Sequence, residues 1–311
     1  MACSRFCLGS PFPSPWDKPG AQVVPMAPGS YPDFCTRLHT PRRSQDIRYT
    51  TEPVVLNTTA SSHHALVMLT APRREPCLEA TLDSMLKAGL ADWPGPRLLV
   101  VDGPVGKLPS DWVTASFPRA AGSSVAFVRA LRLALALDPK LDHLTFVEDD
   151  VEWCQNALDH VARIVVPTDV AFVTWFTYDY DYTFPVFPRQ SPHPSESKNP
   201  VLAIRSTRYF ILTQACTFPR ATVDRILSCP HITDGWPKID SHDEMISWAL
   251  GDALYAVHFP ILLQHTGGLN SAVLLSRGKT LADSGDPQAD ARTSPYFVGV
   301  DFDAHSLSKN E

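Results

Sequence analysis

Three neighbouring carboxylates, Glu148, Asp149 and Asp150, directly follow an apolar run in the sequence HLTFVEDDV. Adjacent carboxylates repel one another unless a positive charge lies between them. The triplet could be a solvated loop, because acidic side chains are favoured just before a helix. It could instead bind a divalent cation, since carboxylate oxygens are the ligands that Mg²⁺ and Mn²⁺ prefer. The buried strand predicted ahead of the triplet favours the cation site.

Two later segments carry residues that could act together with the triplet. In DSHDEMISWAL, Asp243 stands at the start of a predicted helix, where an ionised carboxylate could serve as a general base. Asp240 and Glu244 are competing candidates, and acidic residues are also ordinary in the first turn of a helix. In FPILLQHTGG, His265 ends an apolar run. A lone histidine is usually structural, but a neutral imidazole near carboxylates would suit Mn²⁺ better than Mg²⁺.

The segments that must position these residues alternate between strand and helix. Short apolar runs predict strands, and helical spacing predicts helices of 10 to 15 residues. This alternation indicates an α/β fold with a largely parallel sheet, in which ligands bind beyond the carboxyl ends of the strands. Asp102 and the acidic triplet both follow strands, so we expect them to line one crevice. The predicted strands are 63–72, 97–104, 143–151 and 170–182, and the predicted helices are 75–90, 123–137 and 157–165.

The second half of the chain is less regular. Residues 178–200 form a long predicted loop, rich in aromatic residues first and in Pro and Ser later. Beyond this loop the patterns predict two strands, at 208–218 and 253–265, and two helices, at 220–229 and 242–252. The helix at 123–137 is expected to begin with Ser123 or Ser124 as its N-cap.

Composition limits the class of protein. The chain has 311 residues, of which 44% are hydrophobic and 19% charged, and its net charge of −6 argues against a protein built mainly to grip phosphate backbones. Its 7 cysteines form no CxxC pair, which favours reduced thiols. No apolar run reaches about 18 residues and no signal peptide is evident, so a cytoplasmic protein without a membrane span is predicted. The expected segments are a Pro/Ser-rich extension (1–60), a catalytic domain (61–275) and a C-terminal tail (276–311).

The segment from Gly122 through the acidic triplet resembles the stretch that leads into the DxD motif of GT-A nucleotide-sugar glycosyltransferases. In that family a Gly and an Arg precede a helix, followed by an apolar strand that ends in the acidic motif; Gly122 and Arg129 take those places here. Glu148 departs from the usual Asp, and Asp150 matches the family's metal ligand. The sequence QHTGGLNS, with Gln264, His265 and Gly267, resembles the QHxGxxS segment of the N-acetylglucosaminyltransferase IV-like branch.

This resemblance implies a GT-A, Rossmann-like fold and a set of site residues. Asp150 and His265 would bind Mn²⁺ or Mg²⁺, and Asp243 would be the general base of an inverting reaction. Tyr178, Asp179 and Asp181, with Glu244, are candidates for the acceptor side. The nucleotide would be contacted by Thr70, Arg73, Asp102, Arg129, Glu148 and Asp149.

The implied activity is transfer of a sugar from a UDP-sugar, UDP-GlcNAc by default, to an acceptor hydroxyl. The acceptor is open among a glycan, a natural product, a protein and a hydroxylated base in phage DNA. The aromatic side chains of the loop at 178–200 could stack on sugar rings, or they could simply pack under the loop. Two other classes stay open: a metal-dependent nucleotidyltransferase, which would be expected to carry a Gly-rich, Lys-containing phosphate loop after the first strand, and a non-catalytic sugar- or partner-binding module.

Overall fold

The computed structural model describes residues 51–73, 76–177, 199–206, 210, 213–229, 232, 242–251, 253–267, 294 and 296–308. The chain divides into two units, Met1–Asp46 and Ile47–Glu311, and every described residue belongs to the second. The predicted boundaries at residues 60 and 275 remain predictions. Three acceptor-side candidates lie outside the described residues, together with the side chain of Glu244: these are Tyr178, Asp179 and Asp181.

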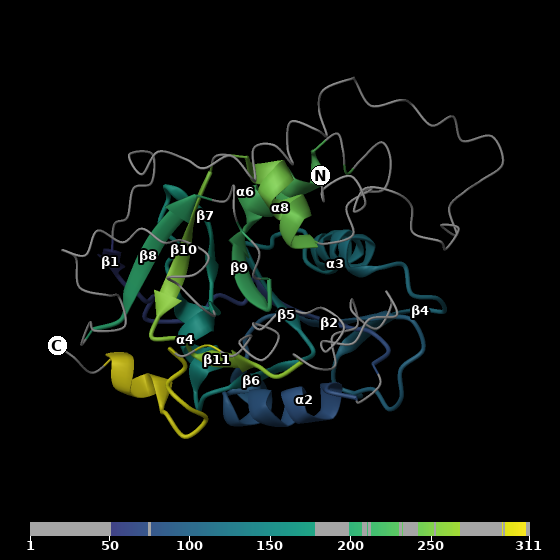
Figure 1. The fold of residues 1–311 in the computed structure, drawn as a ribbon, viewed down its shortest axis with the longest axis horizontal. Helices are drawn as coiled ribbons and strands as arrows, with labels where there is room; N and C mark the ends of the chain where they lie inside the picture. The colour runs from purple at the N-terminus through teal and green to yellow at the C-terminus, as the bar shows by residue number, and fades with distance from the viewer. Residues whose placement is uncertain are drawn as a thin grey trace, which may run out of the picture. The chain divides into compact units, whose positions relative to one another are not determined.

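A nine-stranded mixed sheet forms the centre of the described fold (Figure 1). Four neighbouring strand pairs are parallel, namely β2–β3, β3–β4, β2–β5 and β7–β10, and four are antiparallel. The predicted α/β class is therefore confirmed. In spatial order the strands are β1 (Thr51–Pro53), β8 (Val201–Ser206), β10 (Leu254–Phe259), β7 (Val170–Thr174), β9 (Ala215–Pro219), β5 (His143–Glu148), β2 (His64–Thr70), β3 (Arg97–Asp102) and β4 (Val113–Phe117).

Helices cover both sides of this sheet. Figure 1 shows α3, α6 and α8 on one side and α2 on the other. A second, two-stranded sheet pairs β6 (Val151–Trp153) with β11 (Leu263–His265) in antiparallel register, so that His265 lies opposite Val151. Within the described ranges, every helix is too short or too polar to cross a lipid bilayer. The helices are α2 (Leu78–Lys87), α3 (Ser123–Leu137), α4 (Ala157–Arg163), α6 (Arg220–Leu227) and α8 (His242–Leu250), with short 3₁₀ helices η3 (Leu90–Asp92) and η8 (Ala304–Ser308).

The start of α3 differs from the prediction. The helix begins at Ser123, and its N-cap is Gly122, which has a φ of 97° and no side chain to accept a capping hydrogen bond. Instead, the carboxylate of Asp102 accepts hydrogen bonds from the backbone N–H groups of Ala121 (2.8 Å) and Gly122 (3.0 Å). The carboxylate at the end of β3 thus fixes the backbone of the two residues that lead into α3.

Three strands of the sheet were not predicted. These are β1, which lies inside the predicted extension, β4 and β8. β1 and β4 are the outermost strands of the described sheet, and three of the five residues of β4 are exposed. An edge strand that is half exposed gives a weak apolar pattern, so pairing with the rest of the sheet decides that it forms.

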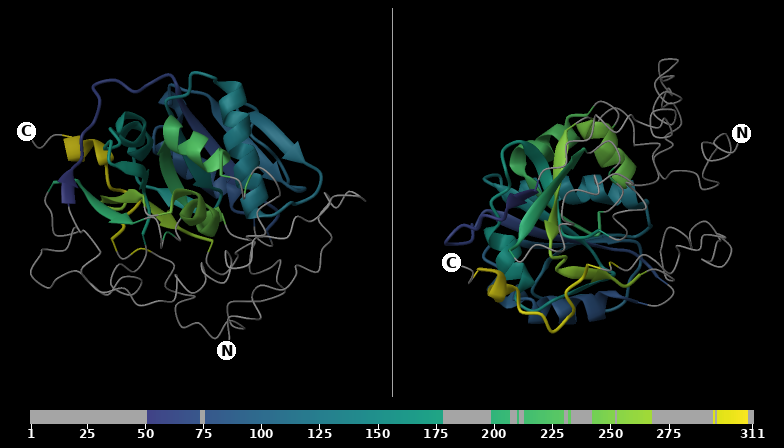
Figure 2. Two further views of the ribbon diagram at one scale, coloured as in Figure 1. Left: turned by 90° about the horizontal axis from the view of Figure 1, so that it is seen from above. Right: turned by 60° about the vertical axis from the view of Figure 1, so that its left-hand side comes forward.

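The carboxyl ends of three parallel strands meet at one edge of the sheet. β2 lies between β3 and β5 with parallel pairing on both sides, so Thr70, Asp102 and Glu148 end their strands at the same edge. β9 runs antiparallel to β5, which brings Thr213, just before β9, to this edge as well. Farther along the chain, η8 packs on α4, and both views of Figure 2 show the yellow C-terminal segment beside that helix. The edge that collects the strand ends is where the candidate site lies.

Candidate functional site

The acidic corner, which we define as Glu148, Asp149 and Asp150, is the turn from β5 into β6. Its backbone is held from three directions. The N–H of Glu148 donates to the carbonyl of Gln214 (2.9 Å), the hydroxyl of Thr81 lies 2.7 Å from the carbonyl oxygen of Asp149, and the N–H of Thr266 donates to the carbonyl of Asp150 (2.8 Å). Asp149 and Asp150 are each 2% exposed. Burial of this kind requires a partner for each charge.

Asp149 is anchored inside the protein. Its Oδ2 accepts a hydrogen bond from the hydroxyl of Thr70 (2.6 Å), and its Oδ1 accepts from Nε (2.9 Å) and Nη2 (2.6 Å) of Arg73. The structure thus brings together three of the residues predicted to contact the nucleotide, and it directs their polar groups toward one another. That they also contact a nucleotide stays a prediction.

Burial and the neighbouring charges have opposite effects on the pKa values of Arg73 and Asp149. Burial raises the pKa of Asp149, against the opposing effects of the Arg73 guanidinium and the Thr70 hydroxyl. Burial would lower the pKa of Arg73, but the carboxylates of Asp150 and Asp149 raise it overall. Three donors lie within 2.9 Å of the Asp149 carboxylate, and these hydrogen bonds favour its ionised form. Asp149 and Arg73 therefore form a buried ion pair.

Asp150 has a different environment from its neighbour. Its Oδ2 lies 3.2 Å from Nε2 of His265 and 2.9 Å from Nη1 of Arg73. Its Oδ1 is buried and has no hydrogen-bond partner within the described part of the chain. Burial would raise the pKa of Asp150, but the hydrogen bond and charge of His265, with the charge of Arg73, hold it below the ordinary value. An ionised carboxylate with one unused buried oxygen is available to a cation.

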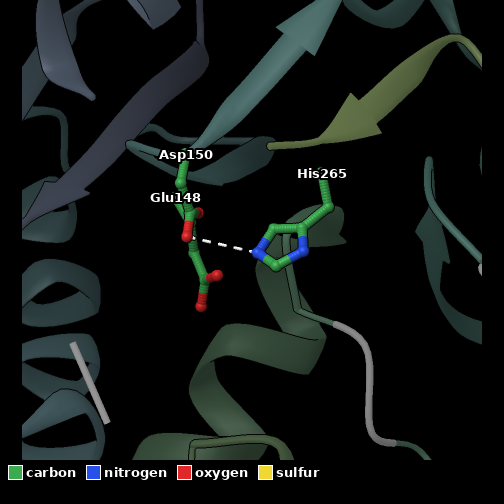
Figure 3. A group of neighbouring side chains, drawn as sticks. All are labelled: Glu148, Asp150 and His265. Atoms are coloured by element: carbon green, nitrogen blue, oxygen red, sulfur yellow. Dashed lines mark hydrogen bonds and ion pairs between the residues drawn. The ribbon is translucent and has the colours of Figure 1, made fainter. Parts of the chain in front are cut away.

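Three side chains are placed to hold that cation. The ligand atoms of Glu148, Asp150 and His265 all lie within 4.8 Å of one another, and Figure 3 shows the imidazole facing the two carboxylates. Two carboxylates and an imidazole suit Mn²⁺ better than Mg²⁺. The residues present therefore fit a divalent metal ion, and the predicted metal-binding pair of Asp150 and His265 is brought together.

The strand that carries His265 is supported by its own sequence motif. The Oε1 of Gln264 accepts hydrogen bonds from the N–H of His265 (3.2 Å) and from the N–H of Ser294 (2.6 Å). At Gly267 a Cβ atom would lie 1.9 Å from Oδ2 of Asp150, so any side chain there would displace the carboxylate. Gly267 therefore lies directly against the carboxylate of Asp150. Asn270 and Ser271, the rest of the predicted motif, lie outside the described residues.

The predicted base, Asp243, lies in the first turn of α8 and is linked to the acidic corner. Nε2 of His242 lies 2.9 Å from Oε1 of Glu148 and 3.9 Å from Oδ1 of Asp243. Oδ1 of Asp243 also accepts a hydrogen bond from the hydroxyl of Thr213. Burial raises the pKa of Asp243, while His242 and Thr213 act against this increase. Glu244, the competitor of Asp243, has no described side chain.

Two residues that contact the predicted site, His242 and Thr213, were not predicted from the sequence. His242 stands directly before Asp243 and could have been noticed as a second titratable group at the helix start. Its contact with Glu148 joins residues far apart in the chain, and nothing in the sequence indicates that contact. Thr213 has no distinguishing local signal, because a threonine before a strand is common.

Asp102 ends β3 beside the start of α3, and Arg129 lies in the middle of α3. Burial raises the pKa of Asp102, and the backbone N–H groups of Ala121 and Gly122 act against it. The guanidinium carbon of Arg129 lies 4.1 Å from the ring centroid of Phe117, in a cation–π contact. In this structure Asp102 supports the helix start, and its predicted contact with the nucleotide stays a prediction.

Comparison with known proteins adds one structural similarity. No protein-family model and no curated protein matches the chain. A solved structure that resembles it is the mannosyltransferase PcManGT from Pyrobaculum calidifontis, in complex with GDP-Man and Mn²⁺, with a TM-score of 0.39 and 14% sequence identity. The match covers 73% of this chain and 62% of that one, less than two thirds of its length. The function of this chain therefore has to be argued from the site.

Proposed function

We propose that the chain is a metal-dependent glycosyltransferase that moves a sugar from a nucleotide-sugar donor to an acceptor hydroxyl. The observation that carries this proposal is the convergence of Glu148, Asp150 and His265 to within 4.8 Å. They converge at the carboxyl edge of parallel strands, where α/β proteins bind ligands. The likeness of the EDD and QHTGG segments to GT-A enzymes supports the same function.

Each residue of the site has a role in this proposal. Asp150, His265 and Glu148 would hold Mn²⁺, or Mg²⁺ in second place. When bound, the ion would offset the charge on the departing diphosphate. Asp149 is the buried anchor of Arg73, and Arg73 in turn reaches Asp150 at 2.9 Å, so this pair keeps the ligand carboxylate in place.

In the proposed transfer step, Asp243 accepts the proton of the acceptor hydroxyl. The oxygen of the acceptor hydroxyl bonds to the anomeric carbon while its proton passes to the Asp243 carboxylate. The bond from that carbon to the diphosphate oxygen breaks, and the diphosphate leaves with the electron pair. Attack from the face opposite the leaving group inverts the configuration. A carboxylate whose pKa is raised by burial is a stronger base than an exposed one. UDP as the nucleotide, with UDP-GlcNAc as the default donor, rests on the family resemblance.

The test measures the release of nucleoside diphosphate from nucleotide-sugars in the absence of an acceptor. The purified chain is incubated with a panel of UDP- and GDP-sugars in Mn²⁺, in Mg²⁺ and in EDTA. We expect metal-dependent release from one sugar, lowered at least about 100-fold in Asp150→Asn because a metal ligand is lost. The control is Asp224→Asn, since Asp224 is 52% exposed and pairs with Arg220 on α6.

Two results would contradict the proposal. One is the absence of metal-dependent release from every sugar, together with no Mn²⁺-dependent binding of UDP or GDP by calorimetry. The other is release of pyrophosphate from a nucleoside triphosphate, which would identify a nucleotidyltransferase.

A further inference from the structure

Each carboxylate of the acidic corner faces its own nitrogen partner. Asp149 pairs with Arg73, Asp150 contacts His265 and Arg73, and Glu148 contacts His242. Glu148 differs from the other two in being 19% exposed and in having a longer side chain. A long, partly exposed side chain samples several rotamers unless a neighbour restrains it. The restraint on Glu148 therefore decides whether it can act with Asp150 and His265.

The ring of His242 is fixed enough to supply this restraint. It is 6% exposed. It stacks on Phe127 of α3, with ring centroids 5.5 Å apart and planes at 21°, and it meets the edge of Phe146 on β5 at 5.7 Å. Both phenylalanines are completely buried. The imidazole is therefore held by the core, which places its Nε2 at ion-pair distance from Glu148, and neither ring nitrogen makes a hydrogen bond within the described residues.

This one nitrogen lies between two acidic groups from different elements. It is 2.9 Å from Oε1 of Glu148, at the end of β5, and 3.9 Å from Oδ1 of Asp243, in α8. Asp243 is held in addition by Thr213. His242 therefore lies at ion-pair distance from both the carboxylate at the cation site and the proposed base.

We infer that His242 is a positioning residue, which holds the carboxylate of Glu148 beside Asp150 and His265 and links it to Asp243. The inference rests on the proposed cation site. It predicts a direct effect of the His242 nitrogen on metal affinity, separate from the effect of its ring on stability. A histidine that only fills the core would affect stability alone.

Two variants separate the nitrogen from the ring. His242→Phe keeps an aromatic ring against Phe127 and removes the nitrogen, whereas His242→Gln keeps an N–H donor and removes the ring. The probe is Mn²⁺ alone, and its free concentration is followed by electron paramagnetic resonance without nucleotide or sugar. Thermal unfolding is measured in parallel in EDTA. The control is His63→Phe, since His63 is 43% exposed and pairs with Asp138 at 2.8 Å, away from the acidic corner.

We expect His242→Phe to weaken Mn²⁺ binding roughly 10- to 100-fold, as removal of a group that orients a metal ligand does. His242→Gln should recover part of the affinity, and His63→Phe should leave it unchanged. The decisive comparison is made in a Glu148→Gln background, where the same His242 substitution should no longer alter Mn²⁺ affinity. If one His242 variant fails to fold, the other completes this comparison.

The failures are distinguishable. If the unaltered chain binds Mn²⁺ and both His242 variants bind it equally well, the positioning role is overturned while the cation site stands. An effect of His242 that persists in full in the Glu148→Gln background also overturns it, since the residue would then act by another route. If the unaltered chain does not bind Mn²⁺, the cation site and this inference both fall.

Discussion

Two of the buried polar clusters in the described part of the chain satisfy their hydrogen bonds in different ways. The first is the neutral chain, which we define as His64, Thr145, Thr217 and Trp175. In it the indole N–H of Trp175 donates to Thr217 (2.8 Å), the two threonine hydroxyls are 2.7 Å apart, and Thr145 lies 2.8 Å from Nε2 of His64. Nδ1 of His64 faces the carbonyl of Ala162 at 3.4 Å and so carries the hydrogen. Every donor in this chain meets an acceptor.

The acidic corner is the opposite case. It holds three carboxylates, pairs them with Arg73, His242 and His265, and leaves Oδ1 of Asp150 without a partner in the described residues. A neutral network with every donor used is complete without any ligand. A charged cluster with an unused buried oxygen is costly unless something else binds to it. The neutral chain thus needs no ligand, whereas the acidic corner fits the proposed role in binding one.

The largest expected effect on stability comes from removing the positive charge of Arg73 from the acidic corner. Arg73→Ala leaves Asp149 buried and unpaired, and we expect it to lower the free energy of unfolding by about 3–5 kcal/mol in urea titrations. The control is Arg97→Ala, which breaks the more exposed pair with Asp111 and should cost no more than about 1 kcal/mol. Equal losses for the two variants would show that the corner is no more dependent on its charges than the surface is.

Metal addition should distinguish the two clusters directly. At about 100 times its dissociation constant, Mn²⁺ should stabilise the protein by about 2.7 kcal/mol, because it binds the folded state. This gain, followed as a rise in the unfolding temperature, should vanish in Asp150→Asn and persist in Thr217→Val. A gain that survives in Asp150→Asn would place the metal elsewhere.

Acid should act on the neutral chain and on a second buried histidine. Burial lowers the pKa of His64 to about 3, and burial also lowers the pKa of His258 to about 4. The unfolded histidines have pKa values near 6.5, so the unfolded state binds more protons as the pH falls from about 6.5 toward 4. We therefore expect stability to fall between pH 7 and pH 5, on the order of 2 kcal/mol per histidine.

The measurement that isolates His64 compares the free energy of unfolding at pH 7 and pH 5 in the unaltered chain and in His64→Gln. The variant should lose less stability on acidification by about 2 kcal/mol. The same loss in both proteins would mean that His64 does not titrate differently on folding.

The smallest expected effect breaks the neutral chain at one hydroxyl. Thr217→Val leaves the indole N–H of Trp175 without its acceptor, at a cost of about 1–2 kcal/mol in the free energy of unfolding. Affinity for Mn²⁺ should not change. Thr114→Val on β4, where the side chain is exposed, is the matched control and should change stability by less than about 0.5 kcal/mol. A change in Mn²⁺ affinity in Thr217→Val would show that the neutral chain affects the acidic corner, and would contradict the distinction between the two clusters.

Much of the fold followed from local patterns, whereas the sheet order did not. The apolar runs at β2, β3 and β5 and the periodic helix α3 were predicted near their observed bounds, because every residue in such a run has the same requirement for burial. β9 lies antiparallel between β5 and β7, and no local pattern indicates that placement. Strand pairing between distant segments depends on the whole sheet, so it could not be predicted from any one of them.

The sequence alone determined that acidic residues would stand at the carboxyl end of a buried strand, and it made Asp150, Asp243 and His265 candidates by their type and position. Only the tertiary structure decided their partners. It gave adjacent residues different environments, with Asp149 turned to Thr70 and Arg73 and Asp150 turned to His265. It also placed His242 against Glu148. The physical reason is that the apolar pattern records the burial of each element, whereas the pairing of buried charges depends on which elements the folded core brings together.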